Sequence, residues 1–548
     1  MLDGFTGYDP DGGGFGVLRN FRVKNGRLIK REGFALQDTL DAPVRGVWYG
    51  DFHGENTLFV CAGSVLYKGL GAGRTAVGTI GTDSGRICMY CYLGTLYLLD
   101  GAEIYGCTAS GFGAVEGYIP TVRIVTGPAQ SRPYEEINRL TDKVRVEIPE
   151  AVNTIQYPLW GSVDSVVSVT SGGVEVGNSL SGSGRSTRIS QSGGSTIPLT
   201  VVYRLADSGR RAALVKHLYA QAYSAAMDNS VFLYGGDDPA RVLYSGWHDG
   251  GPDGTYFPLS NWFYVGDGSR PVTSLVRQYD RLMLFTTGAA YMIRDAGAVS
   301  ENGYTRYVYP VYSLTPGLGC AGGGMTCQAE DSPVTVSSGG VYRWISSDRQ
   351  GEKTAVLISR PAERLLTAEF ITGGTAHVCR RWNEFWLACG GRVLAYDLTG
   401  GTWYLFDGID ADGFFEMEET CFWKGNRICA FSPALRTDDG AAIEAEAVTA
   451  PFDFGAPHLN KRLHHTFVTL DEGSAGMTLE CLADDEAPRC FPLHGVPGCR
   501  ETLRVHTALP RFGTLRLRIR SGADGPLTVT QLGMQYHYLG EVHRQERR

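Results

Sequence analysis

The sequence predicts an all-β protein, a β-propeller of about six or seven irregular blades with a small inserted β domain and a C-terminal β-sandwich. Three observations predict this class. Apolar strands separated by polar or glycine turns recur roughly every 40 to 60 residues. Glycine is abundant, at 73 of 548 residues, and patterns with a helical period are scarce. A three- or four-stranded unit cannot bury both of its faces alone, so neighbouring units are expected to pack against each other.

The repeated unit is clearest in the first part of the chain. The stretches VRGVWYGDFHGENTLFVCAGSVLYKG (44–69) and RICMYCYLGTLYLLDGAEIYGC (86–107) each read as strand, turn, strand, glycine turn and strand. The pattern returns at 222–246, 272–294, 333–344, 376–406 and 418–432. Residues 1–129 are therefore predicted to hold an N-terminal hairpin and the first blades, and residues 222–440 the remaining blades. Only 212–222 and 360–366 would tolerate one or two helical turns.

The segment 130–221 interrupts this repeat and is rich in Ser, Gly, Thr and Val. Loops of this length without structure of their own are rare in compact domains. The stretches VDSVVSVTS and STIPLTVVYRL alternate in hydrophobicity as strands do. We predict an inserted domain that resembles a β-sandwich; a flexible Gly/Ser linker is the alternative.

Residues 441–548 are predicted to form a six-stranded antiparallel sandwich. In this region, longer strands of alternating hydrophobicity replace the short strands separated by glycine turns. In the stretch TLRLRIR, Arg516, Arg518 and Arg520 share one strand face. We interpret this face either as a solvated outer face or as a docking surface for an acidic partner.

Residues 21–34, FRVKNGRLIKREGF, predict a cationic hairpin. Asn25-Gly26 is a favoured pair for a two-residue type I′ turn, because both positions need a positive φ. Folding on this turn places Lys24 opposite Arg27, and like charges opposite each other on a ladder are unfavourable. The interpretation is that the hairpin offers its positive charge to an acidic partner, and the alternative is a solvated hairpin that tolerates the repulsion. The candidate interface residues are Arg22, Lys24, Arg27, Lys30 and Arg31.

The net charge, the apolar runs and the cysteine content argue against several classes of protein. A net charge of −8 argues against a protein whose main role is to grip phosphates. The stretch MLDGFTGYDP lacks the features of a signal peptide, and no apolar run reaches the roughly 18 residues that span a bilayer. The 13 scattered cysteines indicate reduced thiols. Cys88 and Cys91 have CxxC spacing but lie in a strand pattern, so core thiols are favoured over a zinc or redox site.

No phosphate-binding loop, dinucleotide fingerprint or HExxH motif occurs, and no cofactor or metal is predicted. His464 and His465 are adjacent, so on a regular strand their rings point to opposite faces, which favours a core or interface role over metal ligation. The enzymatic alternative is a glycan-cleaving propeller, which needs two carboxylates roughly 5 to 9.5 Å apart. Nothing in the sequence pairs the available acids, and the prediction is that the protein is not an enzyme. The candidate acids are Asp228, Asp237, Asp238 and Glu416.

Several motifs, taken in their order along the chain, resemble those of a known protein family. They are KREGF, RGVWYG, VCAGSVLYKG, YIPTVRI (118–124), YEEINRLT (134–141), the stretch 254–293 that begins GTYFPLSNWFYVGDG and continues SRPVTSLVRQYDRLMLFTTGAAYMI, GGVYRW, RVLAYDLTGGTWYLF and LTVTQLGMQY. In this order they resemble the tail-hub proteins of short-tailed bacteriophages, also called phage stabilisation or tail nozzle proteins. The resemblance covers nearly the whole chain, although each motif is loose. The inserted domain and the long C-terminal sandwich depart from the shortest members of that family.

The resemblance implies a virion component of a phage tail, made in the host bacterial cytoplasm and without catalysis. It implies a homo-oligomeric ring, typically a hexamer, that lies beneath the portal and adaptor, prolongs the DNA channel and holds other tail proteins. DNA would pass through the lumen without sequence-specific binding, and a negative wall would repel its phosphates. A cellular propeller that acts as a scaffold is a third class.

Overall fold

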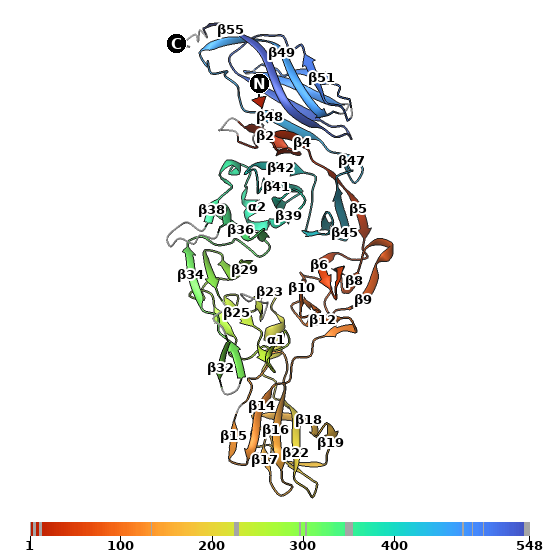
Figure 1. Cartoon of the computed structure of the whole chain (residues 1–548), viewed down its shortest axis with the longest axis vertical. Helices are drawn as coiled ribbons and strands as arrows, with labels where there is room; N and C mark the ends of the chain where they lie inside the picture. The colour runs from red at the N-terminus through yellow and green to blue at the C-terminus, as the bar shows by residue number, and fades with distance from the viewer. Residues whose placement is uncertain are drawn as a thin grey trace. The chain divides into compact units, whose positions relative to one another are not determined.

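The computed structural model describes residues 2–3, 7–9, 14–132, 134–223, 230–294, 298–301, 304–345, 355–473, 476–484, 486–496 and 498–541. The chain divides into two compact units. Unit 1 consists of Met1–Val44 and Ala321–Arg548, and unit 2 consists of Arg45–Cys320. Strands dominate both units, so the predicted all-β class with propeller-type sheets, an inserted β domain and a C-terminal sandwich is confirmed (Figure 1). No helix of the described residues is long and apolar enough to cross a membrane.

Unit 2 contains antiparallel four-stranded sheets in which each strand pairs with the next. These strands are β6 (Val44–Phe52), β7 (Glu55–Ala62), β8 (Val65–Lys68) and β9 (Thr75–Thr79); β10 (Cys88–Tyr92), β11 (Thr95–Leu99), β12 (Ile104–Thr108) and β13 (Gly111–Ala114); β23 (Tyr219–Tyr223), β24 (Ser230–Tyr234), β25 (Arg241–Tyr244) and β28 (Trp262–Tyr264); β29 (Val272–Gln278), β30 (Arg281–Thr286), β31 (Ala289–Ile293) and β34 (Val311–Pro316). The ribbons β26 (Trp247–His248) with β27 (Gly251–Pro252), and β32 (Ala298–Glu301) with β33 (Tyr304–Tyr307), extend two of the connections.

Successive sheets of unit 2 share buried apolar layers. The first layer contains Phe59 and Leu66 of one sheet together with Leu96 and Leu98 of the next. Further layers join the second sheet to the third and the third to the fourth. The second and third sheets therefore bury both faces against neighbours, which is the packing that the repeated strand units predicted.

The inserted domain is a two-sheet structure with its own core (Figure 1). Its larger sheet contains β14 (Thr121–Gly127), β15 (Gln130–Arg132), β16 (Lys143–Ala151), β18 (Val163–Ser171), β19 (Val174–Glu175) and β22 (Ile197–Leu205). Its smaller sheet contains β17 (Tyr157–Pro158), β20 (Asn178–Ser181) and β21 (Arg188–Gln191). Side chains of both sheets, such as Tyr157, Ile189 and Val201, are buried together, which rules out the flexible-linker alternative.

The predicted bounds of 130–221 for this domain are corrected at both ends. β14 belongs to the inserted sheet because it pairs in parallel with β16. At the other end, β23 pairs with β24 in a four-stranded sheet. The helix expected over 212–222 is the short α1 (Arg210–Val215), and the chain then becomes strand. The region 360–366 holds only the 3-10 turn η2 (Arg360–Ala362), followed by α2 (Ala368–Gly373).

Unit 1 contains the remaining four-stranded patterns. They are β35 (Thr326–Ala329), β36 (Ser332–Ser337), β37 (Gly340–Trp344) and β38 (Ala355–Leu357); β39 (Thr375–Cys379), β40 (Glu384–Cys389), β41 (Arg392–Asp397) and β42 (Trp403–Asp407); and β43 (Gly413–Glu416), β44 (Thr420–Lys424) and β45 (Arg427–Ser432), with β5 (Gly33–Thr39) as the fourth strand. The ribbon of β46 (Thr437–Asp438) and β47 (Ala441–Ala442) joins the sheet of β5.

The C-terminal strands are those predicted, with short additions. They are β48 (Ala445–Thr449), β49 (Leu459–Glu472), β50 (Met477–Ala483), β51 (Arg489–Leu493), β52 (Glu501–Val505), β53 (Leu509–Phe512), β54 (Leu515–Ser521) and β55 (Thr528–Glu541). The N-terminal strands join them: β1 (Leu2–Asp3) pairs with β55, β2 (Phe15–Arg19) lies between β42 and β48, and the hairpin of β3 (Phe21–Lys24) and β4 (Arg27–Lys30) pairs with β55. Within unit 1, the N-terminal strands β1 to β5 thus take part in several sheets.

Gly33 marks a tight passage between β5 and β46. A Cβ atom at this position would lie 1.9 Å from the carbonyl oxygen of Thr437. We expect Gly33→Ala to destabilise unit 1 by at least about 3 kcal/mol, because backbone on both sides cannot yield as a side chain can. The measurement is the free energy of unfolding in urea. Gly111→Ala is the control, since nothing lies within 4 Å of a Cβ there, and an equal loss in both variants would contradict the steric explanation.

Candidate functional site

The cationic hairpin has the geometry that the sequence predicted. Asn25 and Gly26 have φ values of 52° and 71°, as a type I′ turn requires. Lys24 lies opposite Arg27 on the ladder. The charged side chains of the hairpin nevertheless lie in different environments. Most of them form ion pairs or hydrogen bonds with other residues of unit 1.

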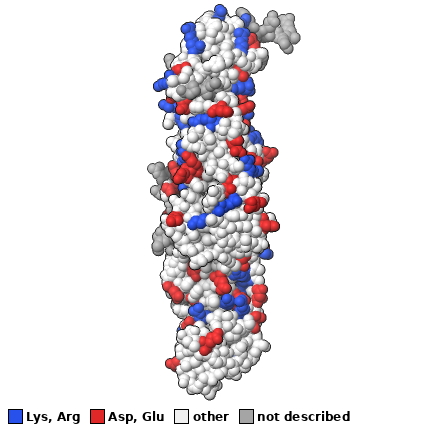
Figure 2. Space-filling model, turned by 90° about the vertical axis from the view of Figure 1, so that its right-hand side faces the viewer, with Lys and Arg blue, Asp and Glu red and all other residues white. Residues whose placement is uncertain are grey.

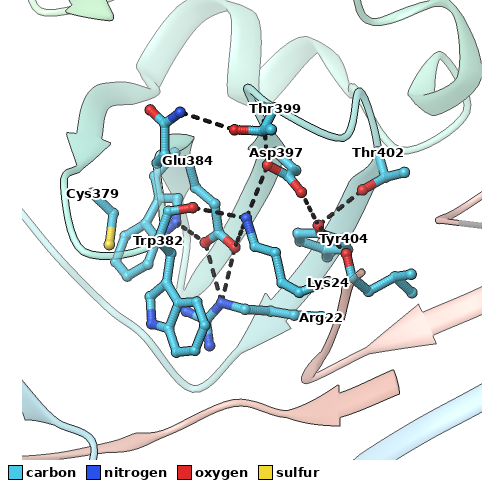
Figure 3. A network of polar contacts seen from close by, with 12 residues as sticks. Arg22, Lys24, Cys379, Trp382, Glu384, Asp397, Thr399, Thr402 and Tyr404 are labelled. Carbon is cyan, nitrogen blue, oxygen red and sulfur yellow. Dashed lines mark hydrogen bonds and ion pairs between the residues drawn. The ribbon is translucent and has the colours of Figure 1, made fainter. Parts of the chain in front are cut away.

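Arg22 lies at the centre of a buried ion network (Figure 3). Its guanidinium binds Glu32 at 2.5 Å and Glu384 at 3.0 Å, and its side chain is 1% exposed. The guanidinium carbon lies 4.6 Å from the ring centroid of Trp382, whose indole donates to Glu32. Burial by itself would lower the pKa of Arg22, but the two carboxylates outweigh it and raise the pKa. The network ties the hairpin to β40.

Lys24 extends this network to the turn after β41 (Figure 3). Its ammonium lies 2.9 Å from Asp397 and 3.4 Å from Glu384, and it donates to the backbone oxygen of Trp382. Asp397 also accepts a hydrogen bond from the backbone N–H of Thr399 within the turn. The repulsion between Lys24 and Arg27 is therefore offset by carboxylates of the same unit.

Lys30 and Arg31 are also buried and paired. Lys30 donates to the backbone oxygen of Ala523, and Arg31 binds Asp438 and donates to Asn20. The prediction that Arg22, Lys24, Lys30 and Arg31 form a surface for an external partner is therefore corrected. Sequence alone could not reveal the partners, because Glu384 and Asp438 lie hundreds of residues further along the chain. The sequence offered two signals, Glu32 within the hairpin stretch itself and Glu384 at the start of the apolar strand EFWLAC.

Lys30 is expected to make stability depend on pH. Burial, with a smaller contribution from Arg31, lowers the pKa of Lys30 to about 8. Between this value and the ordinary lysine pKa of about 10.4, the unfolded chain binds more protons than the folded chain, so stability rises with pH. We expect wild type to gain free energy of unfolding relative to Lys30→Met between pH 7 and pH 10. A difference between the two proteins that stays constant over this range would contradict the expectation.

The remaining predicted cations lie nearer to solvent. Arg27 is 56% exposed and contacts Asp471 at 3.0 Å. On β54, Leu515, Leu517 and Ile519 are buried while the arginines alternate with them, as predicted. Arg518 and Arg520 pair with Glu446 and Glu480 of neighbouring strands, whereas Arg516 is exposed. The strip is thus largely neutralised within its own sheet.

A second polar cluster forms the neck of the inserted domain in unit 2. The motif YEEINRLT lies against the motif GTYFPLSNWFYVGDG through backbone and side-chain hydrogen bonds. Glu136 accepts hydrogen bonds from the N–H and hydroxyl groups of Ser260, and Arg139 donates to the backbone oxygen of Leu259. Two of the motifs that carry the family resemblance therefore bind each other.

Asn138 is the centre of this neck. Its side chain is 0% exposed and uses both ends of its amide. The amide nitrogen donates to the backbone oxygens of Tyr118 and Thr255. The amide oxygen accepts from the backbone N–H groups of Leu140 and Phe257. One side chain thus satisfies four backbone groups from three segments, which holds the inserted domain to the sheet of β28.

A pocket of about 590 Å³ lies beside the neck, between the inserted domain, α1 and β13. Its cations already have carboxylate partners. The ion pairs are Arg204 with Asp142 at 2.7 Å, Arg211 with Glu103 at 2.6 Å and Lys143 with Glu116 at 3.3 Å. The pocket therefore offers little unpaired charge to a ligand.

The candidate acids of the glycan-cleaving alternative are spread over both units. Asp228 lies outside the described residues. Asp237 pairs with Lys216 at 2.7 Å, and Asp238 accepts a hydrogen bond from the hydroxyl of Tyr264. Glu416 on β43 contacts Nε2 of His377 on β39 at 2.6 Å. The first strands of neighbouring sheets meet here, and both side chains are mostly buried.

Among the described residues, the cysteines and histidines form no closed metal site. All 13 cysteines are free thiols, and no group of three or more His, Cys, Asp or Glu side chains in the described ranges could hold a metal ion. Burial raises the pKa of the Cys379 and Cys481 thiols to about 12, which makes them unreactive core groups. The expectation that His464 and His465 point to opposite faces is wrong, because a bulge interrupts β49 between Leu463 and His465.

No family model matches the chain. No curated protein sequence matches it either. Among solved structures, it is similar to an exo-β-1,3-galactanase from Phanerochaete chrysosporium in complex with β-1,3-galactotriose, at a TM-score of 0.23 and 10% identity, over 92% of this chain and 99% of that one. A glycoside hydrolase aligns at a TM-score of 0.22 and 10% identity, over 91% and 99%. Kluyveromyces lactis Hsv2 aligns at 0.26 and 8% identity, over 66% and 97%.

These comparisons correct the prediction that the protein is not an enzyme. Glycoside hydrolases are among the structures that align with nearly the whole chain. TM-scores near 0.2 are too low to assign an activity or a substrate.

Proposed function

We propose that this protein is a structural component of the tail of a short-tailed bacteriophage, a ring-forming hub or nozzle below the portal and adaptor. The observation that carries the proposal is the neck, where YEEINRLT and GTYFPLSNWFYVGDG bind each other through Asn138. A chance likeness of loose motifs gives no reason for two of them to meet in space. A fixed neck suits a domain that must hold a position in an assembly.

The charge distribution agrees with this role. On the face that Figure 2 shows, Lys and Arg side chains are interspersed with Asp and Glu side chains and form no broad basic patch. The net charge of −8 favours a wall along which DNA moves without adhering. The hairpin supports the role in a different way, because its buried ion pairs fasten the N-terminal strands within unit 1.

The test is assembly of the purified full-length chain. We expect rings with a central opening in negative-stain images, a mass of several chains by light scattering, and attachment to a portal–adaptor complex of a short-tailed phage. Discrete monomers at micromolar concentration that bind no such complex would overturn the proposal.

The second candidate is a glycan-acting hydrolase, and the pair of Glu416 with His377 is the observation that favours it. A mostly buried carboxylate on the first strand of a sheet, hydrogen-bonded to a histidine, could exchange a proton with a leaving group. Hydrolysis of chromogenic glycosides by wild type, lost in Glu416→Gln and kept in Asp237→Asn, would support this candidate. No hydrolysis by any of the three proteins would reject it.

A further inference from the structure

The sheet formed by β49, β52 and β55 carries a cluster of four histidines. His464 and His465 belong to β49, His537 belongs to β55, and His506 follows β52. We define these four residues as the histidine cluster. All four side chains are partly or fully exposed, and neither of the proposed functions uses them.

A β-bulge brings the two adjacent histidines to one face. Leu463 and Thr466 flank the pair and are both 0% exposed, so these two positions face the core although they lie three residues apart. A regular strand would place them on opposite faces. The register shift between Leu463 and His465 supplies the extra residue, and both rings then lie on the outer side.

The four rings form two cross-strand pairs. Nε2 of His464 lies 2.7 Å from Nδ1 of His537, and Nε2 of His465 lies 3.2 Å from Nδ1 of His506. Each contact needs one nitrogen that donates and one that accepts, so each pair contains a neutral imidazole with a lone pair. Neutral imidazole nitrogen is the form that binds transition metals.

We propose that the histidine cluster binds a divalent transition-metal ion, Zn²⁺, Ni²⁺ or Cu²⁺, through its cross-strand pairs. Two nitrogens on a tetrahedral zinc, each at about 2.0 to 2.1 Å, lie roughly 3.3 Å apart. The His465 and His506 nitrogens already have this spacing, at 3.2 Å. The His464 and His537 nitrogens need to separate by roughly 0.6 Å, a small movement for exposed side chains.

The site is an exchangeable surface site. No three ligating side chains of the described residues converge on one point, so each ion is held by two imidazoles and completes its shell with water. Arg504 opposes binding, because its guanidinium lies 3.1 Å from Nε2 of His465. Arg462 adds a second positive charge near His464. Imidazole selects Cu²⁺, Ni²⁺ and Zn²⁺ over Mg²⁺ and Ca²⁺.

The test is calorimetric titration of the full-length chain with zinc chloride and copper chloride at pH 7.5. Cys490 and Cys499 are replaced by serine throughout, because they are exposed thiols that would also bind these ions. We expect saturable binding, with the number of bound ions reduced by one in His465→Ala with His506→Ala because the His464–His537 pair remains. We expect His53→Ala with His494→Ala to have no effect, since these residues lie outside the cluster. Arg504→Gln is expected to tighten binding.

Electron paramagnetic resonance with Cu²⁺ supplies a readout that does not depend on affinity. Nitrogen couplings from two imidazoles are expected in the wild type and are expected to be lost in a variant without the four histidines. Circular dichroism establishes that this variant is folded. Absence of saturable binding to wild type, or binding that survives loss of all four histidines, would overturn the proposal.

Discussion

Glu384→Gln is expected to lower the free energy of unfolding of unit 1 by about 3 to 5 kcal/mol. The substitution preserves shape but removes a carboxylate that is 0% exposed and contacts both Arg22 and Lys24. The buried Arg22 and the partly buried Lys24 would then have only Glu32 and Asp397 as carboxylate partners. Breaking a buried ion pair by removing one partner is costly because the remaining charge stays desolvated. Trp382 and Trp386 lie in the network, so tryptophan fluorescence during urea unfolding reports on it directly.

Arg27→Gln is the matched control for this experiment. Arg27 belongs to the same hairpin, but its side chain is 56% exposed and its pair with Asp471 is screened by water. The expected change is about 0 to 1 kcal/mol. The same small effect of both substitutions would show that the network does not stabilise the hairpin. It would favour the alternative of a solvated hairpin.

Asn138→Ala is expected to loosen the neck of the inserted domain. Four backbone groups would lose their partner, and each buried group left unsatisfied costs roughly 1 to 3 kcal/mol. Because water can enter and the costs are not additive, we expect a total of about 3 kcal/mol or more. Hydrogen exchange should become faster around 118–141 and 254–261, while the core strands β16 and β22 keep their protection.

Two comparisons make this result specific. Asn138→Asp keeps an acceptor but loses the amide donor, so an intermediate effect is expected. Asn178→Ala changes an exposed asparagine of the inserted domain and should leave exchange at the neck unchanged. Unaltered exchange in Asn138→Ala would show that the neck does not depend on this side chain, and it would remove the main support for the proposed tail function.

The two results bear on function separately. Loss of the hairpin network would disturb unit 1, where the N-terminal strands join the later sheets. Loss of the neck would release the inserted domain within unit 2 while its own core remains intact. If the protein assembles into rings, the comparison of ring formation in Glu384→Gln and Asn138→Ala shows which of these features the assembly requires.

The sequence by itself determined the local features of this protein. It predicted the type I′ turn at Asn25-Gly26, the alternation of Arg516, Arg518 and Arg520 with buried leucine and isoleucine, and the strand–turn–strand units, because each depends on neighbours within a few residues. Only the tertiary structure decided which partners the charged side chains bind and which way they face. Arg22 meets Glu384 across 362 positions of sequence, and a bulge in β49 turns His465 outward. Turn chemistry and periodicity are short-range, whereas ion pairing and bulges depend on which strands lie side by side, and no local pattern encodes that.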